Sequence, residues 1–426
     1  MNLINILFIE NSVGLAGSTM SLCSLLDYLD ADLFEAHIAL SRNEQEGYLL
    51  GHLRRPAHMA VIAPGRSLRE ASWAQRLLGF AQRRAPWLRG SVARAIAALD
   101  VLVVTIPYAL RLRRWIKDRN IALIHHNNGF DVGALLLSYM VRVPLLAYQR
   151  GDEWNSPLVR WLAPRVTHYI ANSEATKLNL VSIGVPARQI QVIYPPLDLA
   201  VFNLTRRSTL TRATFGVPEA SPCFGIVGLL VAWKGQDVFL RAAKRVLEQV
   251  PDAYAFVIGG APRGGRDYEE MLRALAAELG IADRVIFTGF RSDIPDMLKL
   301  LHVVAHASVQ TEPFGRVIAE AMAMGRPVVA ARAGGPTEII DDGRTGFLVP
   351  TRDDEALANR IAALLRDPEM ATRIGEAGRR AVIEKFSAED HVRLVTELYT
   401  TMLNPRRKAP RATQLIHDVR PVGRRR

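Results

Sequence analysis

Cysteine is scarce in this sequence: its 426 residues include only two, Cys23 and Cys223. Two cysteines so far apart provide neither a disulfide framework nor the closely spaced thiol pairs of a zinc site. This scarcity argues against a small secreted domain held together by disulfides and favours a protein of a reducing compartment.

The sequence also has no clear leader and no clear membrane span. The N-terminal apolar run in MNLINILFIENS lacks a preceding basic stretch and is about six residues long, so it predicts a buried strand. The longest stretch that is poor in charge, residues 95–110, contains Asp100 and Pro107 and is shorter than the ~20 residues that a spanning helix needs. We therefore expect a cytoplasmic chain.

Acidic residues are nearly absent from two segments, which carry the excess of positive charge. The net charge is +12, but residues 66–119 hold twelve basic against three acidic residues, and residues 405–426 hold eight against one. The rest of the chain is slightly acidic, so we expect an anionic surface as a partner outside the active site. Without an RNA-binding motif in the folded body, nucleic acid is not expected as a partner.

The basic segment 66–119 also contains Trp73, Phe80, Trp87, Trp115 and many leucines. Basic and aromatic residues in one amphipathic segment are typical of an interface with anionic lipids. The alternative is a basic helical subdomain that only faces solvent.

Strand-like and helix-like segments alternate along both halves of the chain, beginning with INILFIE and restarting at CFGIVGLL. This alternation predicts an α/β protein of two Rossmann-like domains, whose parallel sheets face a central cleft. The expected divisions are an acceptor domain at 1–200 with a basic helical insert at about 66–119, a donor domain at 201–385, a helix at 386–404 that packs back on the first domain, and a flexible tail at 405–426.

Two glutamates flank a helix expected to begin near Gly315. Glu312 lies just before this helix and Glu320 lies inside it, so both carboxylates can face the end where free amides form an anion site. For an isolated pair of glutamates, exposure to solvent is the more common explanation. Lys234, at a turn between a strand and a helix, adds a cation that can neutralise phosphate.

A series of motifs in the second half resembles the C-terminal domain of glycosyltransferase family 4, which has the GT-B fold. The motifs are, in order, VGLLVAWKGQD, VIGG, VIFTGFRSDI and HASVQTEPFGRVIAEAMAMGRPVVAARAGGPTEIIDDGRTGFLVP. The resemblance covers nearly all of residues 165–390. It implies retaining transfer of a sugar from a nucleotide sugar, without a metal or other cofactor.

The resemblance also implies roles for individual residues. Glu312 would contact the transferred sugar, Glu320 would hold the ribose hydroxyls, and Lys234 would clamp the diphosphate. The full set of donor-binding residues that we expect is Gly228, Lys234, Arg291, Glu312, Phe314, Gly315, Arg316, Val317 and Glu320.

One position departs from the family pattern. Leu229 stands where such proteins usually have a second phosphate-binding arginine, so another cation must replace it or donor activation is weaker. The candidates are Arg150, Arg263 and Arg316. Gly334, Gly335 and Glu338 also match the family, either as donor-site residues or as a tight turn followed by the first turn of a helix.

In the first half, the resemblance places a glycine loop over the diphosphate and the acceptor. Many relatives have a histidine against the sugar where this chain has Asn127, which makes Asn127 the third expected catalytic residue beside Glu312 and Lys234. Polar residues at the carboxyl ends of parallel strands commonly bind ligands. The expected residues of this acceptor and diphosphate loop are Gly14, Gly17, Ser18, His126 and Arg150.

The sequence thus favours a retaining hexosyltransferase that uses a nucleotide sugar. The acceptor would be a saccharide or a lipid-linked saccharide of cell-surface polysaccharide or glycolipid synthesis, met at the inner face of the cell membrane. Two alternatives stay open: a nucleotide-sugar-binding protein that has lost catalysis, and a sugar-nucleotide epimerase with the same fold.

Overall fold

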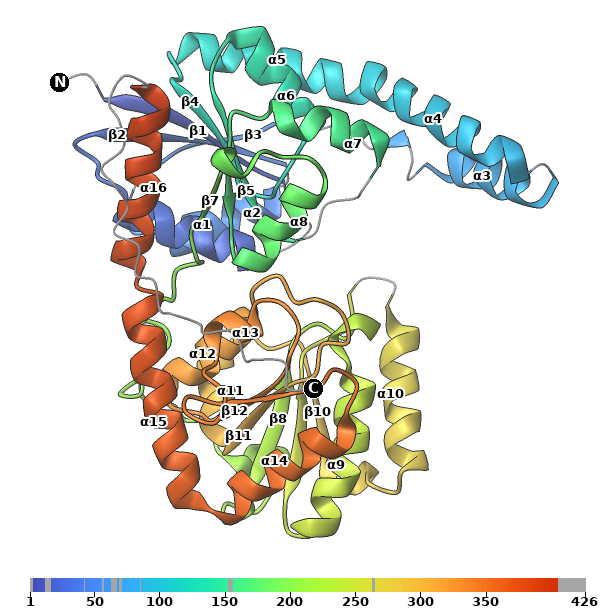
Figure 1. Cartoon of the computed structure of the whole chain (residues 1–426), viewed down its shortest axis with the longest axis vertical. Helices are drawn as coiled ribbons and strands as arrows, with labels where there is room; N and C mark the ends of the chain where they lie inside the picture. The colour runs from blue at the N-terminus through green and yellow to red at the C-terminus, as the bar shows by residue number, and fades with distance from the viewer. Residues whose placement is uncertain are drawn as a thin grey trace, which may run out of the picture.

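The computed structural model describes residues 3–11, 17–41, 43–55, 57–62, 67–68, 71–84, 86–151, 156–262 and 265–404. They form two α/β domains, one above the other in Figure 1. Every strand pairing in both sheets is parallel. The expected α/β architecture of two Rossmann-like domains is therefore confirmed.

The first domain contains a seven-stranded sheet of order β3-β2-β1-β4-β5-β6-β7. Its central strands are buried on both faces, as apolar runs such as ILFI require. The strands are β1 (Ile4–Glu10), β2 (Phe34–Leu40), β3 (His58–Val61), β4 (Leu123–His126), β5 (Leu145–Gln149), β6 (His168–Ala171) and β7 (Ile190–Val192). The helices are α1 (Gly17–Tyr28), α2 (Asn43–His52), α3 (Ser72–Arg84), α4 (Arg89–Asp100), α5 (Ile106–Asp118), α6 (Val132–Val141), α7 (Pro157–Leu162) and α8 (Glu174–Ser182).

The second domain contains a six-stranded sheet of order β10-β9-β8-β11-β12-β13. The strands are β8 (Cys223–Val227), β9 (Tyr254–Ile258), β10 (Val285–Gly289), β11 (Val303–His306), β12 (Val328–Ala331) and β13 (Phe347–Val349). The helices are α9 (Gln236–Gln249), α10 (Arg266–Glu278), α11 (Ile294–Leu300), α12 (Arg316–Ala323), α13 (Pro336–Ile339), α14 (Asp354–Arg366) and α15 (Pro368–Lys385). Two apolar clusters, one on each face of this sheet, form the core of the domain.

The last helix, α16 (Ala388–Leu403), returns from the second domain to the first, where Figure 1 shows it in red. Val395 and Tyr399 belong to the same buried cluster as Phe8 of β1. The Tyr399 hydroxyl also lies 2.5 Å from Nδ1 of His125, at the end of β4. The end of the chain thus completes the core of the domain in which the chain begins.

Between β3 and β4, helices α3 and α4 form an arm that projects from the first domain (Figure 1). The helix that includes α4 and α5 is continuous over Arg89–Asp118, and by length and composition alone it could cross a membrane. The expectation that this segment is too short was therefore wrong. Pro107 does not end the helix, because a wider π turn at Val101–Thr105 takes up the backbone distortion that a proline causes in the preceding turn.

Candidate active site

Glu312 is the centre of a buried polar cluster at the carboxyl end of β11. Only 6% of the residue is exposed. One carboxylate oxygen, Oε2, lies 2.6 Å from Nζ of Lys234, 3.1 Å from Nε2 of His306 and 3.0 Å from Oγ of Ser308. Burial alone would raise the pKa of this carboxyl, but the hydrogen bond from His306 and the charge of Lys234 outweigh it and lower the pKa from 4.5 to about 2. Glu312 is therefore a fixed anion.

His306 and Ser308 belong to this cluster, although neither was among the residues predicted from the sequence. Their signal was present, because HAS stands at the end of an apolar strand, where side chains of an α/β domain reach the ligand side. Both side chains are buried, with 4% of His306 and none of Ser308 exposed. Together with Lys234 they fix the orientation of the Glu312 carboxylate.

The backbone of Glu312 is held by the loop after β12. Its N–H donates to the Ala333 carbonyl at 3.2 Å, and its carbonyl accepts from the N–H of Gly335 at 2.8 Å. A Cβ atom on Gly335 would lie 2.2 Å from the Phe314 carbonyl oxygen, so only glycine allows this approach. A Cβ on Gly334 would likewise lie 2.4 Å from the Glu312 carbonyl oxygen, so both glycines that match the family pattern have a packing reason.

Lys234 reaches Glu312 from the turn between β8 and α9. Its Nζ lies 4.1 Å from the centre of the Trp233 ring. The next residue, Gly235, has φ +69°, and a Cβ there would lie 2.0 Å from the Ala307 carbonyl oxygen. This close approach brings the turn against the end of β11, and so brings the ammonium to the carboxylate.

Helix α12 begins directly after Gly315, as expected from the sequence. Glu320 accepts from Nε and Nη2 of Arg316 at 3.3 and 3.2 Å. Nη1 of Arg316 donates to the Gly17 carbonyl at 2.8 Å and to Oγ of Ser21 at 2.7 Å, both in α1. Arg316 therefore links the carboxylate expected to bind ribose to the first domain, a contact that the sequence did not reveal.

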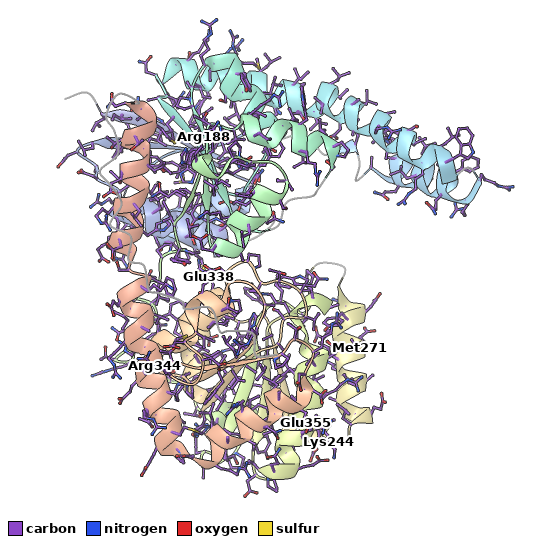
Figure 2. The ribbon with its side chains drawn as sticks, in the orientation of Figure 1. Arg188, Lys244, Met271, Glu338, Arg344 and Glu355 are labelled. Carbon is purple, nitrogen blue, oxygen red and sulfur yellow. The ribbon has the colours of Figure 1, made fainter. Side chains whose placement is uncertain are left out.

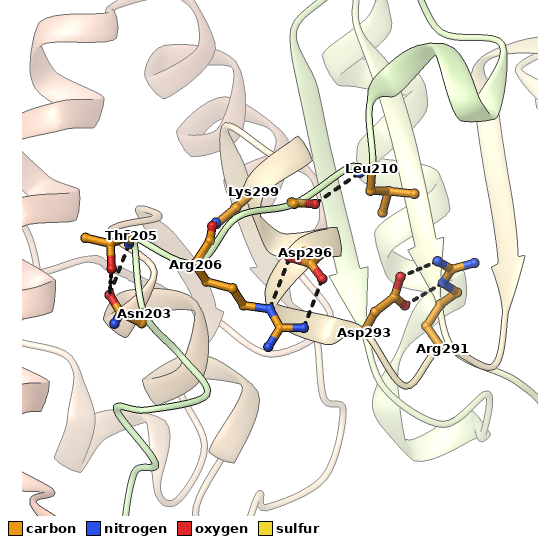
Figure 3. Close-up of polar contacts among 9 residues, drawn as sticks. Asn203, Thr205, Arg206, Leu210, Arg291, Asp293, Asp296 and Lys299 are labelled. Carbon is orange, nitrogen blue, oxygen red and sulfur yellow. Dashed lines mark hydrogen bonds and ion pairs between the residues drawn. The ribbon is translucent and has the colours of Figure 1, made fainter.

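The remaining donor-site predictions fall in three places. Gly228 has φ +153° at the end of β8, and the Leu229 that follows it is 54% exposed. Phe314 is buried, with its ring 5.3 Å from that of Phe386, so only its backbone is available to a ligand. Arg291 pairs with Asp293 beside α11, as Figure 3 shows, and Val317 packs against the core.

In the first domain, a second buried polar cluster occupies the ends of β1, β4 and β5. The Glu10 carboxylate accepts from the amide groups of Asn127 and Asn128. Arg150 donates to the Asn127 side chain and carbonyl, both at 2.8 Å, and lies 3.7 Å above the Tyr148 ring. The structure thus brings together Arg150 and Asn127, two residues that the sequence singled out separately, and adds Glu10, which was not predicted.

Other predicted residues of the acceptor loop lie around this cluster. The Ser18 carbonyl accepts from Asn127 at 3.1 Å, and Nε2 of His126 lies 3.2 Å from the Asn11 amide nitrogen. His126 is 1% exposed. Gly14 and Arg263 lie outside the described residues.

Glu338 joins the two domains at a second point. Its carboxylate accepts from the backbone N–H groups of Glu174 at 2.9 Å and Ala175 at 3.1 Å, the first residues of α8. It also accepts from the Tyr194 hydroxyl at 3.1 Å. Figure 2 places Glu338 on the side of the second domain that faces the first. An anion at a helix start is favourable, so Glu338 acts as a cap supplied by the other domain.

Two Rossmann-like domains with parallel sheets place the protein in the GT-B class, and the buried Glu312 paired with the partly buried Lys234 before a helix start marks its candidate site. Residues 208–381 match the family described as glycosyl transferases group 1, and residues 48–201 match glycosyltransferase family 4. The lipopolysaccharide core biosynthesis mannosyltransferase LpcC of Rhizobium leguminosarum is 31% identical over 295 residues, which are 68% of this chain and 81% of that protein. The chain therefore belongs to the group 1 glycosyltransferases.

Other similar proteins extend this comparison. The D-inositol 3-phosphate glycosyltransferase of Acidothermus cellulolyticus is 35% identical over 255 residues, or 58% of this chain. The chain spans only 50–55% of the length of three curated relatives of this kind.

Among solved structures, Alr3699/HepE of Anabaena in complex with UDP and glucose has a TM-score of 0.76 and 26% identity, and the match covers 93% of this chain and 100% of that one. A glycosyltransferase from Rickettsia africae has a TM-score of 0.78 at 20% identity, covers 95% of this chain and 99% of that one, and supports the fold.

Proposed function

We propose that this protein transfers a hexosyl group from a nucleotide sugar to a saccharide or lipid-linked saccharide, with retention of configuration and without a metal. The observation that carries the proposal is the ion pair between the buried Glu312 and the partly buried Lys234 in front of the helix α12. The pair offers a cation for phosphate and a fixed carboxylate for sugar hydroxyls at one helix start.

In this mechanism Lys234 and the first amides of α12 stabilise the diphosphate as the bond to the sugar loosens. Glu312 holds hydroxyls of the transferred sugar, and its low pKa keeps it an acceptor of hydrogen bonds at neutral pH. The acceptor hydroxyl attacks from the face that the diphosphate leaves, and a diphosphate oxygen takes the proton. An enzymic base is then not required.

The neighbouring structure with UDP and glucose supports a nucleotide sugar as the donor class. We assign Glu320 to the ribose hydroxyls and the backbone at Phe314 and Gly315 to the sugar. Arg150 is held against Asn127, whose side chain also donates to the Ser18 carbonyl in α1, so we assign both to the acceptor side. Arg316 already binds Glu320 and α1, which makes it an interdomain link instead of a free replacement for the arginine missing at Leu229.

The test is release of free nucleoside diphosphate from a panel of nucleotide sugars, with and without a saccharide acceptor, in the presence of a metal chelator. We expect one donor to be turned over, and Glu312→Gln to reduce turnover by roughly a hundredfold or more while the fold is kept. Donor binding without any turnover would favour the binding protein that has lost catalysis, and conversion of the sugar while still attached to the nucleotide would favour the epimerase.

We further propose that the enzyme acts at the cytoplasmic face of a membrane. The support is the basic segment 66–119 and the similarity to LpcC of Rhizobium leguminosarum, a mannosyltransferase of lipopolysaccharide core biosynthesis. Anionic lipids attract such a segment by about 1 kcal/mol for each basic residue near the surface. Sedimentation with anionic vesicles tests this association, and a protein that stays in the supernatant at low salt contradicts it.

A further inference from the structure

The arm of α3 and α4 exposes large apolar side chains that a soluble surface does not need. In the connection between the helices, Trp87 is 80% exposed. On α3, Trp73, Leu77 and Phe80 follow one another at helical spacing and are 47%, 43% and 59% exposed. Three successive apolar positions on one helix face form a patch, and exposed apolar patches mark sites of interaction.

A longer stripe runs along the continuous helix Arg89–Asp118. Its exposed members include Ala95, Leu99, Leu102, Val103 and Leu110, whose successive spacings of four, three, one and seven residues keep them on one face of a helix. From Ala95 to Leu110 the helix rises about 22 Å. Only 22% of the most apolar window of this helix is buried.

The stripe contains no charge along its length. Between Arg94 and Arg111 the only charged residue is Asp100, and its carboxylate accepts from the N–H of Leu68 at 2.6 Å and from the Ser67 hydroxyl at 3.1 Å. The carboxylate of Asp100 is thus hydrogen-bonded to Ser67 and Leu68 and does not interrupt the exposed apolar face. The charges begin again at both ends of the stripe, at Arg94 and at Arg111.

We propose that this stripe enters the acyl-chain boundary of a membrane, with the arm lying in the interface and the flanking arginines on lipid phosphates. This inference rests on the proposed function, in which the enzyme binds its acceptor at a membrane, and it identifies the part of the protein that contacts the lipids. An uncharged apolar face bracketed by cations, on a helix that directly follows the exposed Trp87, is the composition of an interfacial helix.

Charge decides between a membrane and a second copy of the chain as the partner. Residues 72–117 carry nine basic residues and one acidic residue, Asp100. Two such arms placed together would repel each other, whereas an anionic bilayer is attracted to each. The shape agrees, because the arm extends away from both domains, in Figure 1 to the side opposite α16.

The test compares two matched triple variants of the full chain. Leu99→Gln/Leu102→Gln/Val103→Gln removes the middle of the stripe. The control Leu158→Gln/Leu178→Gln/Val181→Gln changes two leucines and a valine of comparable exposure on α7 and α8. Binding is measured by sedimentation with vesicles of equal parts phosphatidylglycerol and phosphatidylcholine, and with phosphatidylcholine alone, at low and high salt. Circular dichroism checks that the helices persist.

We expect the stripe variant to bind the anionic vesicles roughly a hundredfold more weakly, about fivefold for each large side chain kept in water. The control should bind like the wild type, and part of the wild-type binding should survive high salt, because apolar insertion is not screened. Equal binding by the stripe variant, or complete loss of wild-type binding at high salt, would overturn insertion. A wild-type dimer in light scattering that the stripe variant abolishes, without vesicle binding, would assign the stripe to a second copy.

Release of nucleoside diphosphate in vesicle-free buffer separates this inference from the proposed function. The stripe variant should keep the wild-type rate there, because the stripe is remote from Glu312. Wild-type turnover without vesicle binding would refute insertion alone. Vesicle binding without turnover of any donor would refute the proposed function alone.

Discussion

Removing the ammonium of Lys234 should destabilise the protein more than any surface ion pair could. In Lys234→Met, the Glu312 carboxylate stays buried and keeps His306 and Ser308 as its partners within the described part of the chain. The drop in its pKa from 4.5 to about 2 corresponds to about 3 kcal/mol in favour of the ionised form, to which Lys234 contributes. Breaking a buried pair from one side typically costs about 3–5 kcal/mol. We therefore expect Lys234→Met to lower the free energy of unfolding by about 3 kcal/mol.

The decisive comparison is a double-mutant cycle. Glu312→Gln alone should cost about 1 kcal/mol, since the Lys234 side chain is 20% exposed and can remain hydrated. The double variant should cost less than the sum of the two, with a coupling of about 2 kcal/mol. The matched control is the exposed pair Lys244 and Glu248, where Lys244→Met/Glu248→Gln should show a coupling below about 0.5 kcal/mol.

Urea unfolding at pH 7, followed by tryptophan fluorescence and circular dichroism, gives these free energies. Both probes must report the same transition in the second domain for the cycle to be valid. Additive costs for Lys234→Met and Glu312→Gln would refute the argument, because they would mean that the carboxylate does not depend on the ammonium.

Three further predictions follow from the same region. Gly335→Ala should lower the unfolding free energy by about 2 kcal/mol or more in thermal or urea unfolding, because its Cβ would meet the Phe314 carbonyl at 2.2 Å; unchanged stability would contradict the close approach. Arg316→Leu should raise the KM for the donor severalfold, because the hydrogen bond from Arg316 of α12 to Ser21 of α1 is lost, and Arg316→Lys should restore part of the donor affinity. An unchanged KM in steady-state kinetics would show that this link does not affect donor binding. The difference in unfolding free energy between wild type and Glu312→Gln should shrink by about 1 kcal/mol from pH 7 to pH 4. The lowered pKa of Glu312 stabilises the folded state fully above pH 4.5, and this stabilisation is lost as the pH falls toward about 2. A difference that stays constant with pH would contradict the lowered pKa.

Much of the architecture could be predicted from local sequence. Apolar runs separated by helical periodicity indicated parallel sheets, because strands buried on both faces need continuous apolar sequence. The order of motifs around Lys234, Glu312 and Glu320 indicated the family, and the start of α12 after Gly315 followed from turn chemistry. These features depend on neighbours within a few residues, which a linear sequence records.

The contacts between distant segments could not be predicted in this way. The position of HAS at a strand end marks His306 and Ser308 as residues on the ligand side, but it does not show that they bind the Glu312 carboxylate, and nothing local shows that Glu10 accepts from Asn127. Each of these contacts depends on which strands become neighbours and on where the side chains at their ends point.

What the sequence alone determined about this protein is the type of each domain, the donor-side motif and the two basic segments. Only the tertiary structure decided how these parts meet. Arg316 binds α1 and Glu338 caps α8. The helix that contains Pro107 is continuous and exposes an apolar stripe to solvent. The physical reason is the range of the interactions. Periodicity and turn chemistry act over a few residues, whereas ion pairs, caps and exposed faces depend on the docking of segments far apart in the chain.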